Sequence, residues 1–255
     1  MGAPAGTSAL WYLTRGTGVV ALVLLTVSVA LGVAKVRRTR SERVPRFVLD
    51  AVHRNVSLLA VVFLAVHIAT SVLDTFAPVR LIDAVIPFVS AYRPVWLGLG
   101  AVAMDLLIAV ALTSVLRRRV GRRLWRATHW LAYACWPVAV LHGVGTGSDV
   151  NSAWMMALTA GCVLVVLAAI AIRAAGAREG RRGGRIGAIT VSIAAALALL
   201  AWLPTGPLAP GWAKRAGTPS SLLRTSSSTI TSTTSSSGSL KTVAAAHVAA
   251  GEGGG

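Results

Sequence analysis

Charged residues, and acidic ones above all, are scarce in this sequence of 255 residues. Only 13% of the residues are charged, 8 aspartates and glutamates stand against 25 lysines and arginines, and 55% of the residues are hydrophobic. About a quarter of the residues in a typical soluble domain are charged, so this composition excludes an ordinary water-soluble protein. We therefore predict an integral membrane protein in contact with lipid.

Cysteines and nucleotide-binding motifs are also scarce. The two cysteines, Cys135 and Cys162, fall in separate apolar runs, so free buried thiols are expected and a disulfide framework is not. No glycine-rich dinucleotide fingerprint lies between a predicted strand and a helix, because the stretch GRIGAIT opens an apolar run instead. The chain is thus not expected to take hydride from a nicotinamide cofactor by itself.

The sequence does contain long apolar runs, six of which can cross about 30 Å of hydrocarbon. They cover residues 17–35, 48–73, 94–116, 124–145, 153–173 and 186–203. Because the connections are short, we predict an all-α bundle of six transmembrane helices within residues 17–205. Residues 1–16 are predicted to be a short outer segment, and the low-complexity residues 206–255 an extracytoplasmic, disordered tail.

The basic residues are clustered in alternate connections. The loops after the first, third and fifth predicted spans hold 17 of the 25 lysines and arginines, whereas the two loops between them offer only Arg80 and Arg93. The positive-inside rule then places the odd loops in the cytoplasm and both termini outside. This alternation indicates membrane topology, so we expect a multi-pass protein of the cell membrane and no nucleic-acid partner.

Four histidines lie at membrane depth, two in the second predicted span and two in the fourth: His53, His67, His129 and His142. An ionisable side chain at this depth is costly, usually faces the bundle interior and usually has a function. One histidine alone would more readily be a hydrogen-bonded packing residue. Two matched pairs indicate a functional site.

The spacing within the two pairs is nearly equal. At about 1.5 Å per residue, His53 and His67 lie about 21 Å apart along the helix, and His129 and His142 about 20 Å apart. Both predicted spans run from inside to outside, so His53 shares an inner level with His129. His67 shares an outer level with His142. Two imidazoles that face each other are what axial ligation of a haem iron requires.

The angular phase of the fourth predicted span is less regular. At about 100° per residue, a gap of 14 residues returns to within about 40° of the same helix face, whereas a gap of 13 misses it by about 140°. Pro137 lies between His129 and His142 and removes a backbone hydrogen bond, so we predict that a kink there corrects the phase. Without that correction the chain would hold only one haem.

Intramembrane histidines also occur in haem-free transporters and in scaffolds that bind metal or protons. A metal-ion transporter usually has carboxylates at the same depth, and here Asp105 is the only acid deep in a predicted span. A zinc enzyme is a poor fit because ligands about 20 Å apart cannot share one ion. The haem-free transporter or scaffold stays open as the alternative.

Two stretches, HRNVSLLAVVFLAVH in the second span and RATHWLAYACWPVAVLHG in the fourth, resemble the ferric reductase-like transmembrane domain family. The resemblance covers about residues 8–205. That family includes the membrane cores of ferric reductases and NADPH oxidases and the haem subunit of bacterial methionine sulfoxide reductase systems. It implies two b-type haems stacked across the bilayer, with His53 and His129 on the inner iron and His67 and His142 on the outer iron.

The resemblance also implies transmembrane electron transfer, as the membrane subunit of a reductase system. Ferric reductases and NADPH oxidases carry a flavin and nicotinamide domain for which this sequence shows no motif. Electrons are therefore expected from quinol or a separate flavoprotein, which supplies the quinone or flavin, and would leave to an outer acceptor or partner protein. Arg54 and Arg126 are predicted to pair with haem propionates.

Overall fold

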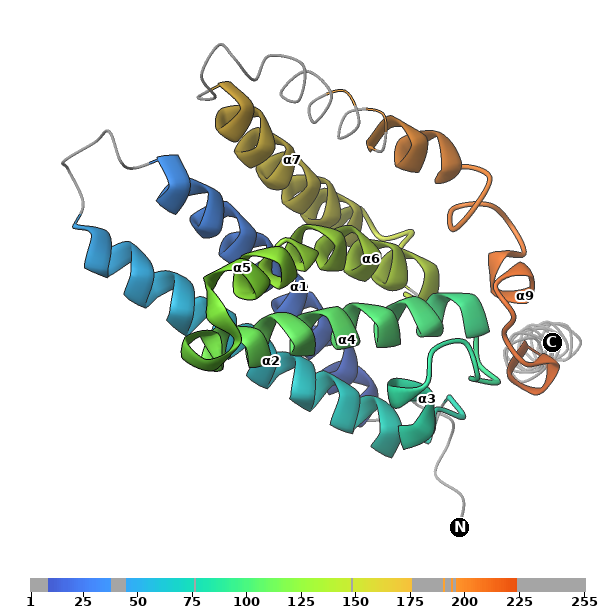
Figure 1. Cartoon of the computed structure of the whole chain (residues 1–255). Helices are drawn as coiled ribbons and strands as arrows, with labels where there is room; N and C mark the ends of the chain where they lie inside the picture. The colour runs from blue at the N-terminus through green and yellow to red at the C-terminus, as the bar shows by residue number, and fades with distance from the viewer. Residues whose placement is uncertain are drawn as a thin grey trace, which may run out of the picture.

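The structure is a computed structural model that describes residues 9–37, 45–75, 77–147, 149–175, 190, 194 and 196–223. Over these residues the chain consists of helices joined by turns, with no strand (Figure 1). The helices are α1 Ala9–Arg37, α2 Arg46–Leu73, α3 Leu81–Val85, α4 Pro94–Val115, α5 Arg117–His129, α6 Leu131–Thr146, α7 Ala153–Ala175 and α9 Trp212–Arg215. The all-α prediction is confirmed for this part of the chain.

Four of these helices contain a stretch long and apolar enough to cross a membrane. The stretches are Ala9–Ala34, Phe47–Leu73, Pro94–Val115 and Ala153–Arg173. At most 22% of the most apolar window in any of them is buried, so most of each helix surface is available to lipid. They correspond to the first, second, third and fifth predicted spans. Of the sixth prediction, residues 186–203, the structure describes only residues 190, 194 and 196–203.

The predicted fourth span is interrupted. α5 ends at His129, α6 begins at Leu131, and the backbone N–H of Trp130 donates to the carbonyls of Ala127 and Thr128 in a tight turn. α6 continues as a helix through Pro137. A break therefore falls directly after His129, where none was predicted, and the kink at Pro137 stays a prediction. The two histidines of this region consequently sit on two separate helices.

α1 is the central helix of the described bundle. It packs along α2, α6 and α7, while α4 packs along α5 and α6. The buried core joins α1, α6 and α7 and includes Leu22, Val140 and Val166. Trp136 also lies in this core, where its Nε1–H donates to Thr26 Oγ1 at 2.9 Å. These contacts pack α6 against α1 and α7.

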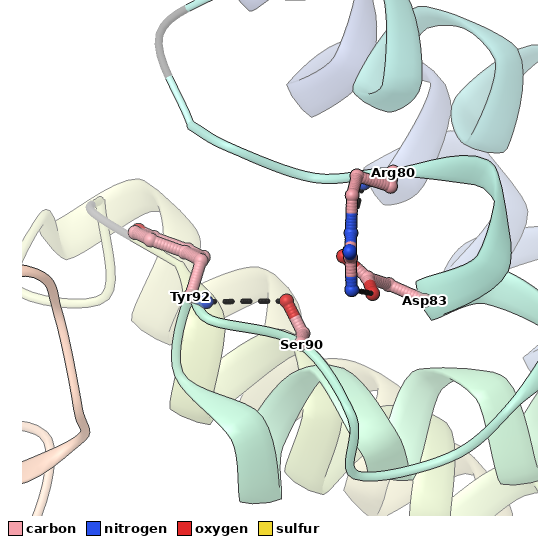
Figure 2. Close-up of polar contacts among 4 residues, drawn as sticks. All are labelled: Arg80, Asp83, Ser90 and Tyr92. Atoms are coloured by element: carbon pink, nitrogen blue, oxygen red, sulfur yellow. Dashed lines mark hydrogen bonds and ion pairs between the residues drawn. The ribbon is translucent and has the colours of Figure 1, made fainter.

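The connection between α2 and α4 is anchored by a buried carboxylate on α3. Asp83 is 1% exposed and accepts hydrogen bonds from the backbone N–H and the guanidinium of Arg80, at 3.0 and 3.1 Å (Figure 2). Burial alone would raise the pKa of the Asp83 carboxyl, but the hydrogen bonds and charge of Arg80, with a hydrogen bond from Ser90, hold that pKa below its usual value. The carboxylate is therefore ionised at neutral pH.

Residues 212–218 pack onto the start of α4 and the end of α6. The Trp212 ring lies 5.2 Å from the Trp96 ring, and the Thr218 hydroxyl accepts a hydrogen bond from Arg93. Residues 206–223 thus have defined contacts, which differs from the disordered tail expected from residue 206. Residues 224–255 lie outside the described part of the chain.

Candidate functional site

The four histidines form two facing pairs. His53 of α2 and His129 of α5 have ring centroids 6.4 Å apart and ring planes at 78°. His67 of α2 and His142 of α6 also have ring centroids 6.4 Å apart, with ring planes at 81°. The structure thus brings together the same partners that the axial spacing paired at the inner and outer levels.

The separation in both pairs suits two axial ligands of one metal. A metal–imidazole bond is about 2 Å long and the ring centroid lies about 1 Å behind the bonding nitrogen, so opposed ligands place their centroids about 6 Å apart. Among the described residues, no three histidine, cysteine, aspartate or glutamate side chains gather as a metal site. Two imidazoles per level leave the equatorial positions to other donors, which a porphyrin supplies in haem.

Backbone hydrogen bonds orient both rings of the outer pair. His67 Nδ1 lies 2.7 Å from the carbonyl oxygen of Thr14 in α1, and His142 Nδ1 lies 2.8 Å from that of Trp96 in α4. Because a carbonyl oxygen only accepts, each Nδ1 carries the proton and each Nε2 keeps its lone pair for a metal. Such a partner on the second nitrogen also strengthens electron donation by the ligating nitrogen.

Glycines lie against three of the four histidine rings. A Cβ atom on Gly18 would lie 3.0 Å from the His67 ring, and one on Gly32 would lie 3.6 Å from the His53 ring. A Cβ atom on Gly100 would lie 2.6 Å from the His142 ring. Our sequence reasoning missed these glycines, although Gly18 and Gly32 are 14 residues apart, the same interval as His53 and His67. That repeated interval was the available signal.

A cavity of about 300 Å³ is lined by His67 and His142, the outer pair. This volume is at the lower end of the range of about 300–1,000 Å³ for small-molecule and cofactor sites. Arg15 lines the cavity near the start of α1, forms an ion pair with Asp149, and lies with its guanidinium 4.0 Å from the centroid of the Trp11 ring. A cation therefore lines the same cavity as the outer pair.

The two arginines predicted to pair with propionates are not buried beside the histidine rings. Arg54 and Arg126 are both exposed, and neither belongs to the described lining of the outer cavity. Near the inner pair, the Trp125 ring stacks on the His129 ring at 5.2 Å and 27°. Trp125 Nε1–H is buried and has no hydrogen-bond partner among the described residues. A buried donor beside a histidine ring fits a ligand that brings its own acceptor.

The fold and the site define a helical membrane protein with two facing histidine pairs at different depths. Residues 17–140 match the family described as ferric reductase like transmembrane component. The match includes His53, His67 and His129 and ends two residues before His142. Members of this family generally bind haem and are typically redox subunits of membranes. No curated protein and no solved structure matched the chain.

Proposed function

We propose that this protein transfers single electrons across the membrane through two b-type haems, as the membrane subunit of a reductase system. His53 and His129 would hold the inner iron, and His67 and His142 the outer one. The observation that carries the proposal is the equal centroid separation of 6.4 Å in both pairs. Bound haem would supply an iron that alternates between the ferric and ferrous states.

The chain's own residues would hold the cofactors and adjust their surroundings. The Nε2 atoms of His67 and His142 are presented by their Nδ1 hydrogen bonds to backbone carbonyls. Gly18 on α1 and Gly100 on α4 leave room for the rings of His67 and His142 to pack directly against these helices. Trp125 Nε1–H is placed to donate to an inner propionate, and Arg15 to pair with an outer one.

The proposed topology puts the inner pair near the cytoplasm. The arginines of α5 are all exposed and lie on the helix that ends at His129: Arg117, Arg118, Arg119, Arg122, Arg123 and Arg126. Their number favours the cytoplasmic side for this end of the bundle, and with it six spans and both termini outside. A quinol or a separate flavoprotein would deliver electrons, and an outer acceptor or partner protein of the cell membrane would receive them.

The test is haem content and its dependence on each pair. Purified protein reduced with dithionite should show the split absorption band of low-spin b haem, with two haems per chain. His67→Ala should remove the outer haem and His53→Ala the inner one, whereas His247→Ala, outside all predicted spans, should retain both. A colourless protein from cells with ample haem would contradict the proposal and favour a haem-free transporter or scaffold.

A further inference from the structure

Arg93 joins three parts of the chain at the outer end of the bundle. Its side chain is buried, and Nη1 donates to the carbonyls of Gly145 and Thr146 in the last turn of α6, at 2.9 and 3.1 Å. Its Nε donates to Thr218 Oγ1 at 2.9 Å, and its backbone N–H donates to the Gly217 carbonyl at 3.1 Å. One residue therefore links the start of α4, the end of α6 and the segment after the last long helix.

Three tryptophans reinforce the same junction. The ring centroids of Trp96 and Trp202 are 5.1 Å apart, and that of Trp212 lies 5.2 Å from Trp96 and 5.7 Å from Trp202. Trp212 Nε1–H donates to the Gly145 carbonyl at 3.3 Å. The Trp96 ring also fills the space that a Cβ atom on Gly145 of α6 would need. Trp96 is thus held between α6 and residues 202–212.

These contacts hold the two residues that form one hydrogen bond of the outer pair, Trp96 and His142. The backbone carbonyl of Trp96 accepts from His142 Nδ1 at 2.8 Å, and Gly145 follows His142 by three residues on α6. We infer that Arg93, Trp202, Trp212 and Thr218 form an outer clasp that positions His142 as a ligand of the outer haem. This inference rests on the proposed haem-binding function, and it gives residues 202–218 a role at the site.

Arg93→Gln tests the clasp in the full-length, haem-loaded protein. The substitution removes the guanidinium that spans α4, α6 and Thr218, so the Trp96 carbonyl and His142 would lose their fixed relation. Loss of a partner that orients a metal ligand weakens metal binding by about 10–100-fold, so the outer haem should pass to excess apomyoglobin at least about tenfold more readily. The outer haem's reduction potential should also become more positive, because weaker donation from His142 stabilises the ferric iron less.

Matched variants separate positioning from charge and from general stability. Arg93→Lys keeps the positive charge but lacks the planar guanidinium, so its outer haem affinity and potential should resemble those of Arg93→Gln. Wild-type values of both in Arg93→Lys would overturn the clasp. Thr218→Val should give a smaller change of the same sign at the outer haem alone. Arg117→Gln removes an exposed arginine at the start of α5, a helix that carries no ligand of the outer pair, and should leave the outer haem potential unchanged.

The outcomes distinguish this inference from the proposed function. His67→Ala identifies which spectral component is the outer haem. If wild-type protein holds two haems and Arg93→Gln changes neither the affinity nor the potential of the outer one, the clasp is refuted and the proposed function stands. Equal loss of both haems in Arg93→Gln and Thr218→Val would also refute the clasp. A haem-free wild-type protein would refute the proposed function and the clasp with it.

Discussion

Alanine substitutions at the three glycines that face histidine rings should weaken haem binding in an order set by distance. The added Cβ atom would lie 2.6 Å from the His142 ring at position 100, 3.0 Å from the His67 ring at position 18, and 3.6 Å from the His53 ring at position 32. The first distance forces the ring to move, the second is tight, and the third is an ordinary van der Waals contact. Gly100→Ala should therefore be the most damaging and Gly32→Ala the least.

Two opposing free energies set the size of each effect. Adding a methyl group to a filled space costs about 1–3 kcal/mol, whereas alanine in place of glycine stabilises a helix interior by up to about 1 kcal/mol. Gly32→Ala has no overlap to relieve, so its free energy of unfolding should be unchanged or up to about 1 kcal/mol higher. Gly100→Ala should push His142 away from the Trp96 carbonyl and lower outer haem affinity by about 10–100-fold.

Haem titration of each purified variant measures this order, with the reduced spectrum reporting the two haems separately. Gly32→Ala is the matched control, because it adds the same atom to α1 at the inner level. Size-exclusion chromatography and thermal unfolding would check that each variant is folded. The reasoning would be refuted if Gly100→Ala kept the outer haem at wild-type affinity, or if it lost the inner haem instead of the outer one.

Three further predictions address single side chains. Trp125→Phe keeps the ring beside His129 but removes the buried Nε1–H, so the inner haem should bind more weakly in a haem titration; unchanged affinity would contradict a role as propionate donor. Trp136→Phe removes the hydrogen bond to Thr26 and should lower stability by about 1 kcal/mol, seen as a fall in Tm, with the haem spectrum unchanged. The Asp83 pKa is lower in the folded protein than in the unfolded chain, so the carboxylate stabilises the fold at neutral pH. This contribution should fade as the pH falls below about 4. Asp83→Asn should be less stable at pH 7 and lack this acid-dependent loss; an identical pH profile of unfolding would contradict it.

The spans and the pairing of the histidines were predictable because they depend on local composition and on helix rise. Apolar runs of the length of a bilayer identified the four described helices that are long and apolar enough to cross a membrane, and nearly equal axial gaps matched His53 with His129 and His67 with His142. Gly18 and Gly32 could also have been predicted to face the histidines, because their interval on α1 equals that of His53 and His67 on α2.

The break in the fourth span and the contacts of the last segment were not predictable in the same way. The stretch RATHWL contains neither proline nor glycine, so nothing local marks the turn at Trp130, whereas Pro137 is a strong local signal that α6 accommodates. Trp212 and Thr218 lie in a segment rich in proline and glycine, which favours turns. Their order comes from partners on α4 and α6, which are distant in sequence.

The 14-residue interval on α1 makes the two levels of the site geometrically dependent on each other. Because Gly18 faces His67 and Gly32 faces His53, sliding or rotating α1 against α2 would bring bulkier side chains against both rings together. A one-residue insertion between the glycines would turn one of them away by about 100° while the other stayed in place. The two helices thus share one interval of 14 residues. A glycine pair and a histidine pair, each separated by thirteen intervening residues on successive spans, form a sequence signature for finding other proteins built on the same two levels.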